Sequence, residues 1–201
     1  MTRILLATRN PKKLAELNRI LAAESITGIE IIGLDSVPPF PEAPETGATF
    51  EENALAKARD AARATNLPAI ADDSGLAVDA LNGMPGVLSA RWSGKHGDDL
   101  ANLELVLAQI SDVPDGRRGA AFVCAAALAV PTRTETVVTA TWPGTLTREP
   151  RGINGFGYDP IFIPHGHTQT SAELDPATKD ALSHRGQALR LLAPHLQRLT
   201  A

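Results

Sequence analysis

The stretch that most constrains this chain is 69–79, where an apolar run leads into two adjacent carboxylates, Asp72 and Asp73, and resumes after a Ser-Gly pair. We expect a buried strand to end there in a polar glycine turn, the position where α/β proteins carry their chemistry. Adjacent buried carboxylates repel each other and therefore favour a nearby cation. A hard divalent ion such as Mg²⁺ suits their oxygen ligands. Taken alone, the same residues are equally compatible with a solvated turn.

The amino-acid composition is typical of an ordinary globular protein. The chain has 201 residues, of which 43% are hydrophobic and 21% charged, so we expect a single domain over residues 1–201, built as two lobes. A net charge of −4 argues against a nucleic-acid backbone binder, which would be basic. The single cysteine, Cys124, has no partner for an internal disulfide. We find no signal peptide and no apolar window long enough for a bilayer, and we expect a cytoplasmic protein.

The N-terminal segment predicts a strand, a tight turn and a helix. Residues 4–7 form a continuous apolar run, after which Asn10 can cap a helix that Pro11 opens and that extends to residue 23. A helix N-terminus suits a phosphate group. Lys12 and Lys13 oppose the usual preference for acids in a first helical turn, and a bound anion would explain them. A solvated basic turn is the alternative.

Glu45 follows a proline-rich stretch, 37–44, that must be a rigid loop. A helix is expected over 50–64, since Thr49 and Glu52 have the spacing of a capping box. Glu45 is therefore either a third acidic metal ligand beside the two aspartates or an exposed loop acid, and its position alone does not decide.

The remaining pattern completes an α/β fold. Helix 98–110 should turn Leu100 inward with four further apolar residues, and two long apolar runs favour an antiparallel strand pair. We expect a long mixed β-sheet flanked by helices, in two lobes with a central substrate cleft. The other expected elements are strands 30–34, 118–130, 135–147 and 161–163 and a final helix from about 183.

Acids for a metal, a phosphate-binding turn and an aromatic ring in a glycine-dense loop together suggest a nucleoside triphosphate. A metal ion neutralises phosphate oxygens, and a carboxylate can take a proton from water. Five ordered blocks resemble the Ham1/inosine triphosphate pyrophosphatase family over nearly the whole chain. These blocks are Thr8-Arg9-Asn10-Pro11-Lys12-Lys13, Glu45-Thr46-Gly47-Ala48-Thr49-Phe50, Ala71-Asp72-Asp73-Ser74-Gly75-Leu76, Gly155-Phe156-Gly157-Tyr158-Asp159-Pro160 and Ser183-His184-Arg185-Gly186.

The resemblance implies a Mg²⁺-dependent homodimer that hydrolyses ITP, dITP and XTP to the monophosphate and pyrophosphate. It implies that Asp73 is the general base and a metal ligand, with Glu45 and Asp72 completing the metal site. The implied substrate-binding residues are Thr8, Arg9, Asn10, Pro11, Lys12, Lys13, Ser74, Phe156, Gly157, Tyr158, Asp159, Lys179, His184 and Arg185.

Within this set, Phe156 would stack on the base, and His184 or Arg185 would donate to the 6-oxo group. Adenine carries an amino group there, so a donor facing it would lose its partner. How GTP is excluded does not follow from the sequence.

The chain departs mildly from the family pattern. Arg9 occupies a position that is often small in the family, and His165 and His167 lie in a variable loop, where a solvated loop is the better interpretation than a metal site. Trp92 and Trp142 are better explained by aromatic packing at a lobe or dimer contact than by a place in the site.

Two other functions fit part of the pattern. A regulator could hold a purine triphosphate without cleaving it, although the aspartate pair argues against this. A pyrophosphatase for modified pyrimidine nucleotides, or a general phosphatase, is the third possibility.

Overall fold

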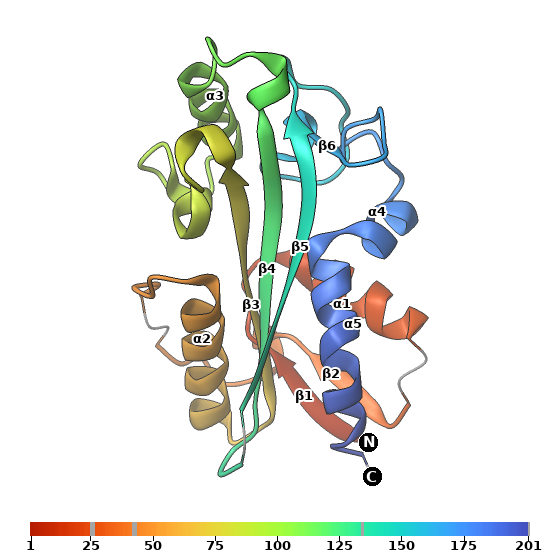
Figure 1. The fold of residues 1–201 in the computed structure, drawn as a ribbon. Helices are drawn as coiled ribbons and strands as arrows, with labels where there is room; N and C mark the ends of the chain where they lie inside the picture. The colour runs from red at the N-terminus through yellow and green to blue at the C-terminus, as the bar shows by residue number, and fades with distance from the viewer. Residues whose placement is uncertain (25–26, 42–43, 134, 201) are drawn as a thin grey trace. The chain divides into compact units, whose positions relative to one another are not determined.

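The computed structural model of this chain describes residues 1–24, 27–41, 44–133 and 135–200, and it describes the backbone but not the side chain of Lys12. Six strands form one mixed sheet in the order β2-β1-β3-β4-β5-β6, with helices beside it (Figure 1). The strands are β1 (Thr2–Leu6), β2 (Ile29–Ile32), β3 (Ala69–Val78), β4 (Gly119–Ala129), β5 (Thr136–Leu146) and β6 (Phe162–Pro164). The α-helices are α1 (Pro11–Ala23), α2 (Phe50–Thr65), α3 (Asp99–Gln109), α4 (Pro176–Leu182) and α5 (His184–Gln197).

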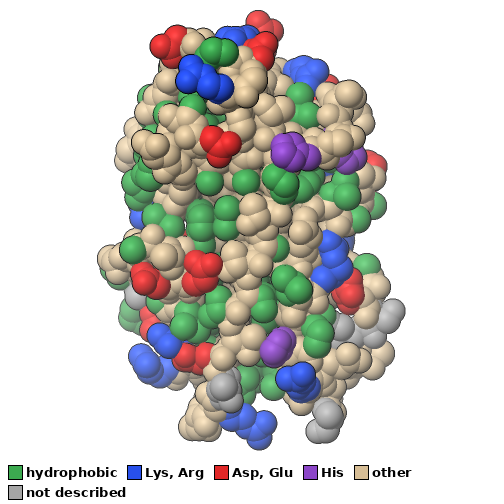
Figure 2. Space-filling model, in the orientation of Figure 1, with side chains coloured by type: hydrophobic (Ala, Val, Ile, Leu, Met, Phe, Trp, Pro, Cys, Tyr) green, Lys and Arg blue, Asp and Glu red, His purple; other side chains and the backbone are tan. Residues whose placement is uncertain are grey.

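The predicted mixed α/β sheet is confirmed. Strand β1 pairs in parallel with β2 and with β3, whereas β5 and β6 are antiparallel. The two long predicted strands, β4 and β5, are neighbours in the sheet. In the described part of the chain no helix is both long and apolar enough to cross a membrane. On the face drawn in Figure 2, acidic and basic side chains lie interspersed among apolar and neutral ones.

The chain divides into two compact units, which we describe separately. The first unit comprises residues 1–73, 124–140 and 185–201, and the second comprises 74–123 and 141–184.

The first unit buries both faces of its strands. Alternate strand residues such as Ile4 and Ile70 pack with α1 and α5, whereas Leu5 and Ala71 pack with the alanine-rich face of α2. This alternation follows from the two-residue period of a strand. The result is a three-layer arrangement, with α1 and α5 on one face and α2 on the other (Figure 1).

The second unit has its own core. Strand residues Leu76 and Phe122 pack with the inward stripe of α3, represented by Leu103 and Val106, and with Phe162. Leu100 was expected to belong to this stripe, and that prediction is wrong because its side chain is 63% exposed. At 100° per residue, Leu100 lies about a quarter turn away from the middle of the buried stripe.

Local capping explains where several helices begin. Asn10 Oδ1 accepts from the N–H of Lys13 at 3.4 Å, as the sequence predicted. Thr49 Oγ1 accepts from the N–H of Glu52 at 3.2 Å, and the Glu52 carboxylate returns to the N–H of Ala48 at 2.7 Å. The predicted capping box is therefore present, with its return bond one residue earlier than the motif requires. Of the predicted loop 37–44, residues 42–43 lie outside the described residues, and the rest forms no α-helix or strand.

The predicted glycine turn after Asp73 is wrong. Strand β3 continues without a break through Asp72, Asp73, Ser74 and Gly75 to Val78. A Cβ atom at Gly75 would collide with the hydroxyl of Ser89 and with a backbone carbonyl. Gly75 therefore lies inside a strand, where the lack of a side chain lets a neighbouring segment approach closely. It does not form a turn.

Candidate active site

Asp73 lies on the face of β3 that packs against α2, since it shares the parity of Ala71 along the strand. Its carboxylate accepts from the Asn53 side chain at 3.0 Å and lies 3.3 Å from the Lys57 ammonium. The same ammonium forms an ion pair with Glu45. Glu45 and Asp73 therefore converge on one positive charge supplied by α2.

The surroundings of Asp73 suit a proton acceptor. Its side chain is buried, and this burial is the main cause of a raised pKa, which Lys57 and Asn53 partly offset. The nearby Glu45 charge acts in the same direction as burial. For Lys57, burial alone would lower the pKa, but the Asp73 and Glu45 carboxylates outweigh burial and raise it. A carboxylate with a raised pKa, held in a fixed position, is well placed for general base catalysis.

Asp72, one residue earlier, belongs to a different cluster. Its carboxylate lies 2.8 Å from Lys13 Nζ on α1 and 3.2 Å from Arg185 Nε on α5. Arg185 also pairs with Glu16 of α1. Although burial opposes ionisation, the charges of Lys13 and Arg185 lower the pKa of Asp72 well below its usual range. Asp72 therefore stays ionised and links α1, β3 and α5.

The turn before α1 is closed by a local hydrogen bond. Thr8 Oγ1 accepts from the N–H of Asn10 at 3.1 Å, Pro11 opens the helix, and its first turn carries no acid. Arg9 is exposed. The Lys12 side chain lies outside the described residues. Lys13 reaches β3 through its ion pair with Asp72.

Ser74 follows Asp73 in β3 and is partly buried. By residue range it belongs to the second unit, as do Lys179 and the glycine-dense loop 155–160, which carries Phe156 and is called the aromatic loop below.

In the second unit, the loop around Phe156 is held by a buried ion pair. Asp159 accepts from the N–H of Phe156 at 2.8 Å and pairs with Lys179, and Ser171 donates to its other oxygen at 2.8 Å. The Lys179 ammonium lies 5.4 Å from the centre of the Phe156 ring. Phe156 and Gly157 are partly exposed, whereas Tyr158 and Asp159 are buried.

His184 is buried in an aromatic group. Its ring stacks on Phe122 with centroids 4.8 Å apart and planes 9° apart, and it faces Trp142 at 6.4 Å. Trp142 packs in the core of the second unit, and Trp92 donates to Gln109 at 2.8 Å. The ring contacts of Trp142 agree with the expected aromatic packing, and Trp92 packs partly buried against the same core. A lobe or dimer contact of either tryptophan stays a prediction.

Two further residues of this site were missed from the sequence. Asn53 and Lys57 stand four residues apart on α2 and therefore share one face of that helix. In the sequence, polar Asn53 and Lys57 interrupt the alanine-rich segment with a spacing of four residues, and this is a signal that could have identified them. Glu16, which pairs with Arg185, carries no comparable signal.

The carboxylates around Asp73 are oxygen donors of the kind that a hard divalent ion prefers. Among the described residues, no three His, Cys, Asp or Glu side chains gather as a metal-binding group. Glu45 and Asp73 nevertheless share one cationic partner, and a pair of carboxylates around one positive charge fits a hard divalent ion. The Glu45 and Asp73 carboxylates therefore fit such an ion. Asp72, the third metal ligand that the resemblance implies, pairs with Lys13 and Arg185 in this structure, and its place at the metal stays a prediction.

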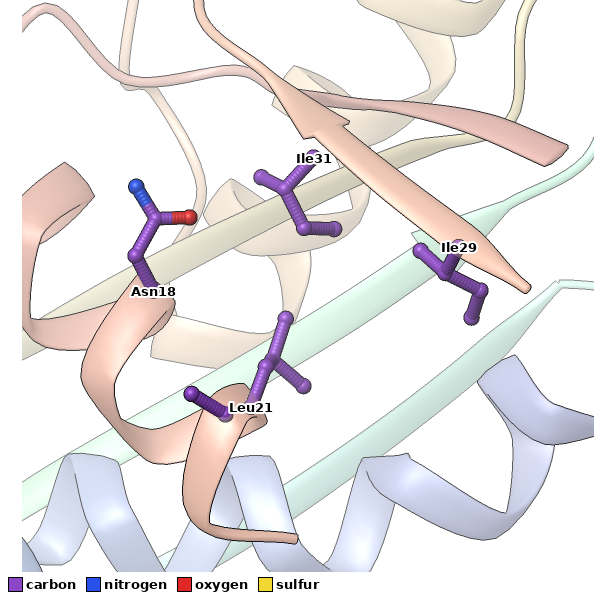
Figure 3. A pocket seen from close by; sticks show the side chains of 5 residues that line it. Asn18, Leu21, Ile29 and Ile31 are labelled. Carbon is purple, nitrogen blue, oxygen red and sulfur yellow. The ribbon is translucent and has the colours of Figure 1, made fainter. Parts of the chain in front are cut away.

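A hollow of about 200 Å³ elsewhere in the first unit is a weaker candidate. Figure 3 shows side chains of α1 and β2 that line it. Its described lining residues are Asn18, Leu21, Ala22, Ile29 and Ile31. One amide and four apolar side chains offer no charge for a phosphate group or a metal ion.

Comparison with known proteins points in one direction. The model of the Ham1 family matches residues 4–195. The chain is 68% identical over 199 residues to the dITP/XTP pyrophosphatase of Nocardia farcinica, covering 99% of this chain and 97% of that protein. It is 61% identical to the dITP/XTP pyrophosphatase of Mycobacteroides abscessus, covering 98% of this chain and 96% of that protein.

Solved structures agree. A crystal structure of a nucleoside-triphosphatase / dITP/XTP pyrophosphatase from Mycobacterium abscessus matches with a TM-score of 0.78 at 61% identity, covering 97% of this chain and all of that one. A HAM1 protein from Coxiella burnetii matches with a TM-score of 0.86 at 46% identity, covering 98% and 100%.

Proposed function

This chain belongs to the Ham1 family, and we propose that it hydrolyses ITP, dITP and XTP to the nucleoside monophosphate and pyrophosphate. The observation that supports this most strongly is near-complete alignment, at up to 68% identity, with dITP/XTP pyrophosphatases. The cluster of Glu45, Lys57 and Asp73 is chemically suited to the reaction. A regulator that binds a nucleotide without cleaving it is not favoured.

In the proposed reaction Asp73 takes a proton from the attacking water. The water oxygen forms a new bond to phosphorus, the phosphoanhydride bond between the α and β phosphates breaks, and pyrophosphate and the monophosphate separate. Burial and the Glu45 charge support this role because both raise the pKa of Asp73 toward the range of a working base.

Glu45 and Asp73 would hold the divalent ion, which we propose is Mg²⁺. When bound, it neutralises charge on the phosphate oxygens. Lys57 lies in ion-pair contact with both carboxylates, so positive charge is already favoured at this position. Asp72 would act through Lys13, holding its ammonium beside the turn that carries the phosphates.

Substrate binding is divided among the proposed residues. Thr8, Asn10 and Lys13, with the first N–H groups of α1, would bind the phosphates. Ser74 would add a contact beside the base Asp73. The remaining proposed phosphate contacts are Arg9, Pro11 and Lys12.

Phe156 would stack on the nucleobase, supported by the loop of Gly157, Tyr158 and Asp159 and by Lys179. His184 or Arg185 would donate to the 6-oxo group, which adenine lacks. We further propose that the protein is a homodimer and works in the cytoplasm, where nucleotide pools lie.

A substrate panel tests this function. Purified protein is incubated with Mg²⁺ and, separately, ITP, dITP, XTP, GTP, ATP and dUTP, and pyrophosphate and orthophosphate are measured in each reaction. We expect pyrophosphate from ITP, dITP and XTP and little product from ATP. Nucleotides that bind but stay unchanged would favour the regulator. Preference for dUTP would favour a pyrophosphatase for modified pyrimidine nucleotides, and orthophosphate as the first product would favour a general phosphatase.

A further inference from the structure

Two consecutive residues of the aromatic loop are held from outside the loop. The N–H of Gly157 donates to Asp99 Oδ2 at 3.1 Å, and the hydroxyl of Tyr158 donates to the carbonyl of Ser89 at 2.8 Å. Asp99 is the first residue of α3, and Ser89 lies in the 3-10 helix Gly86–Arg91. The residues directly after Phe156 are therefore tied to two different elements of the second unit.

Ser89 is itself fixed on β3. Its buried hydroxyl accepts from the N–H of Leu76 at 2.9 Å and donates to the carbonyl of Gly86 at 2.6 Å. The missing side chain at Gly75 allows this approach. The carbonyl that receives the Tyr158 hydroxyl thus has a set position relative to the strand that follows Asp73.

Asp99 is not required to cap its own helix. The neighbouring Asp98 is the N-cap residue, and its carboxylate accepts from the N–H of Ala101 at 3.3 Å. The Asp99 side chain is exposed, so its role is separable from folding of the core. Burial, and after it the negative charge of Asp99, raises the pKa of Tyr158, which keeps the phenol protonated and able to donate.

We propose that Asp99 and Ser89 are positioning residues that fix the Phe156 loop in the conformation that receives the nucleobase. This inference rests on the proposed function, since it assigns the loop to base binding. A loop that is already ordered loses less conformational entropy when the ligand binds. Loss of either anchor should therefore weaken nucleotide binding more than it slows the chemical step.

The test uses three variants and one control in the full chain. Asp99→Ala removes one acceptor, Tyr158→Phe removes the donor to Ser89, and Asp99→Asn keeps an acceptor oxygen. Asp98→Ala, the matched control, removes the helix cap from the adjacent position. Hydrogen exchange of the loop amides is measured without nucleotide, and KM and kcat are measured with ITP.

We expect faster exchange at residues 155–159 in Asp99→Ala and Tyr158→Phe, and a KM raised roughly threefold to tenfold, as for loss of one hydrogen bond. The change in kcat should be smaller than the change in KM. Asp99→Asn should restore most of the protection, and Asp98→Ala should lower thermal stability without altering exchange in the loop.

Wild-type exchange and KM in both Asp99→Ala and Tyr158→Phe would overturn the proposal. An equal loosening in Asp98→Ala would also overturn it, because the effect would then come from the helix end. Faster exchange with an unchanged KM would overturn the role in base binding. Absence of ITP hydrolysis by the wild type would instead contradict the proposed function, and the exchange measurement would still decide whether the loop is held as described.

Discussion

The carboxylate of Asp73 lies 3.3 Å from the ammonium of Lys57 on α2, whereas that of Asp72, the preceding residue, lies 2.8 Å from Lys13 on α1. The two acids are neighbours in β3, and the strand pleat directs them to opposite faces of the sheet. One acid has a raised pKa and the other a lowered pKa. This separation places the adjacent aspartates in different clusters of charges, so we expect their roles to be separable by mutation.

Asp73→Asn should lose activity and keep the fold. The variant removes both the proposed base and a proposed metal ligand, so kcat for ITP should fall by roughly a hundredfold or more. Because burial already disfavours the charged form of Asp73, a neutral amide should leave the free energy of unfolding within about 1 kcal/mol of the wild type. Steady-state kinetics and urea unfolding check both parts. Turnover near the wild-type value would remove Asp73 from the chemistry.

Asp72→Asn should mainly lower stability, whereas Asp73→Asn should mainly lower activity. The substitution leaves Lys13 and Arg185 beside a neutral group in a buried site. Breaking a buried ion pair from one side should cost about 3 kcal/mol of unfolding free energy. Asp73→Asn is the matched control at the adjacent position. Equal stability of the two variants would contradict the assignment of separate clusters.

Lowering the pH should reduce the stability that the ionised Asp72 carboxylate contributes to the fold. The pKa of Asp72 is lowered in the folded protein, so its stabilising effect is complete above the unfolded value of about 3.9 and is lost as the pH falls below it toward the folded value. The stability difference between wild type and Asp72→Asn should therefore narrow from pH 5 to pH 3 in urea unfolding. A constant difference over that range would show that ionisation of Asp72 does not stabilise the fold.

Lys13→Ala should weaken triphosphate binding more than it harms the fold. Arg185 remains beside Asp72 in this variant, so the buried carboxylate keeps a charged partner. A charged hydrogen bond to phosphate should be worth about tenfold or more in KM for ITP. Arg63→Ala, at a side chain 79% exposed on α2, is the control for losing one positive charge. Unchanged KM and kcat in Lys13→Ala would mean that the phosphates bind elsewhere.

Gly75→Ala should destabilise the protein. The added methyl group would meet the carbonyl of Gly86 and the hydroxyl of Ser89, and a backbone carbonyl cannot move aside cheaply. Overpacking of this kind should cost about 1–3 kcal/mol of unfolding free energy. Gly116→Ala is the control, because a Cβ atom there would meet nothing within 4 Å. Similar melting temperatures for the two variants would show that β3 tolerates a side chain at Gly75.

Local patterns in the sequence predicted the elements well and the surroundings of the site less well. The cap at Asn10 and the capping box at Thr49 depend on neighbouring residues, and both lie where expected. The turn at Gly75 was wrong because the segment that requires glycine there, around Ser89, lies 13 residues further along the chain from Leu76.

Charge pairing over long separations could not be read from local patterns. Arg185 is 113 residues from Asp72, and no periodicity indicates that they meet. Without that contact, the two aspartates look like a single acidic pair. Lys57 was missed although its spacing of four residues from Asn53 could be seen in the sequence.

The stoichiometry of products from ITP tests the central claim most directly. Wild type and Asp73→Asn are incubated with ITP and Mg²⁺, and IMP and pyrophosphate are quantified in the same samples, with a metal chelator in a parallel set. We predict equal amounts of IMP and pyrophosphate from the wild type, and little of either from Asp73→Asn or from the chelated samples. Unchanged ITP with the wild type, orthophosphate in place of pyrophosphate, or full activity in Asp73→Asn would contradict the account.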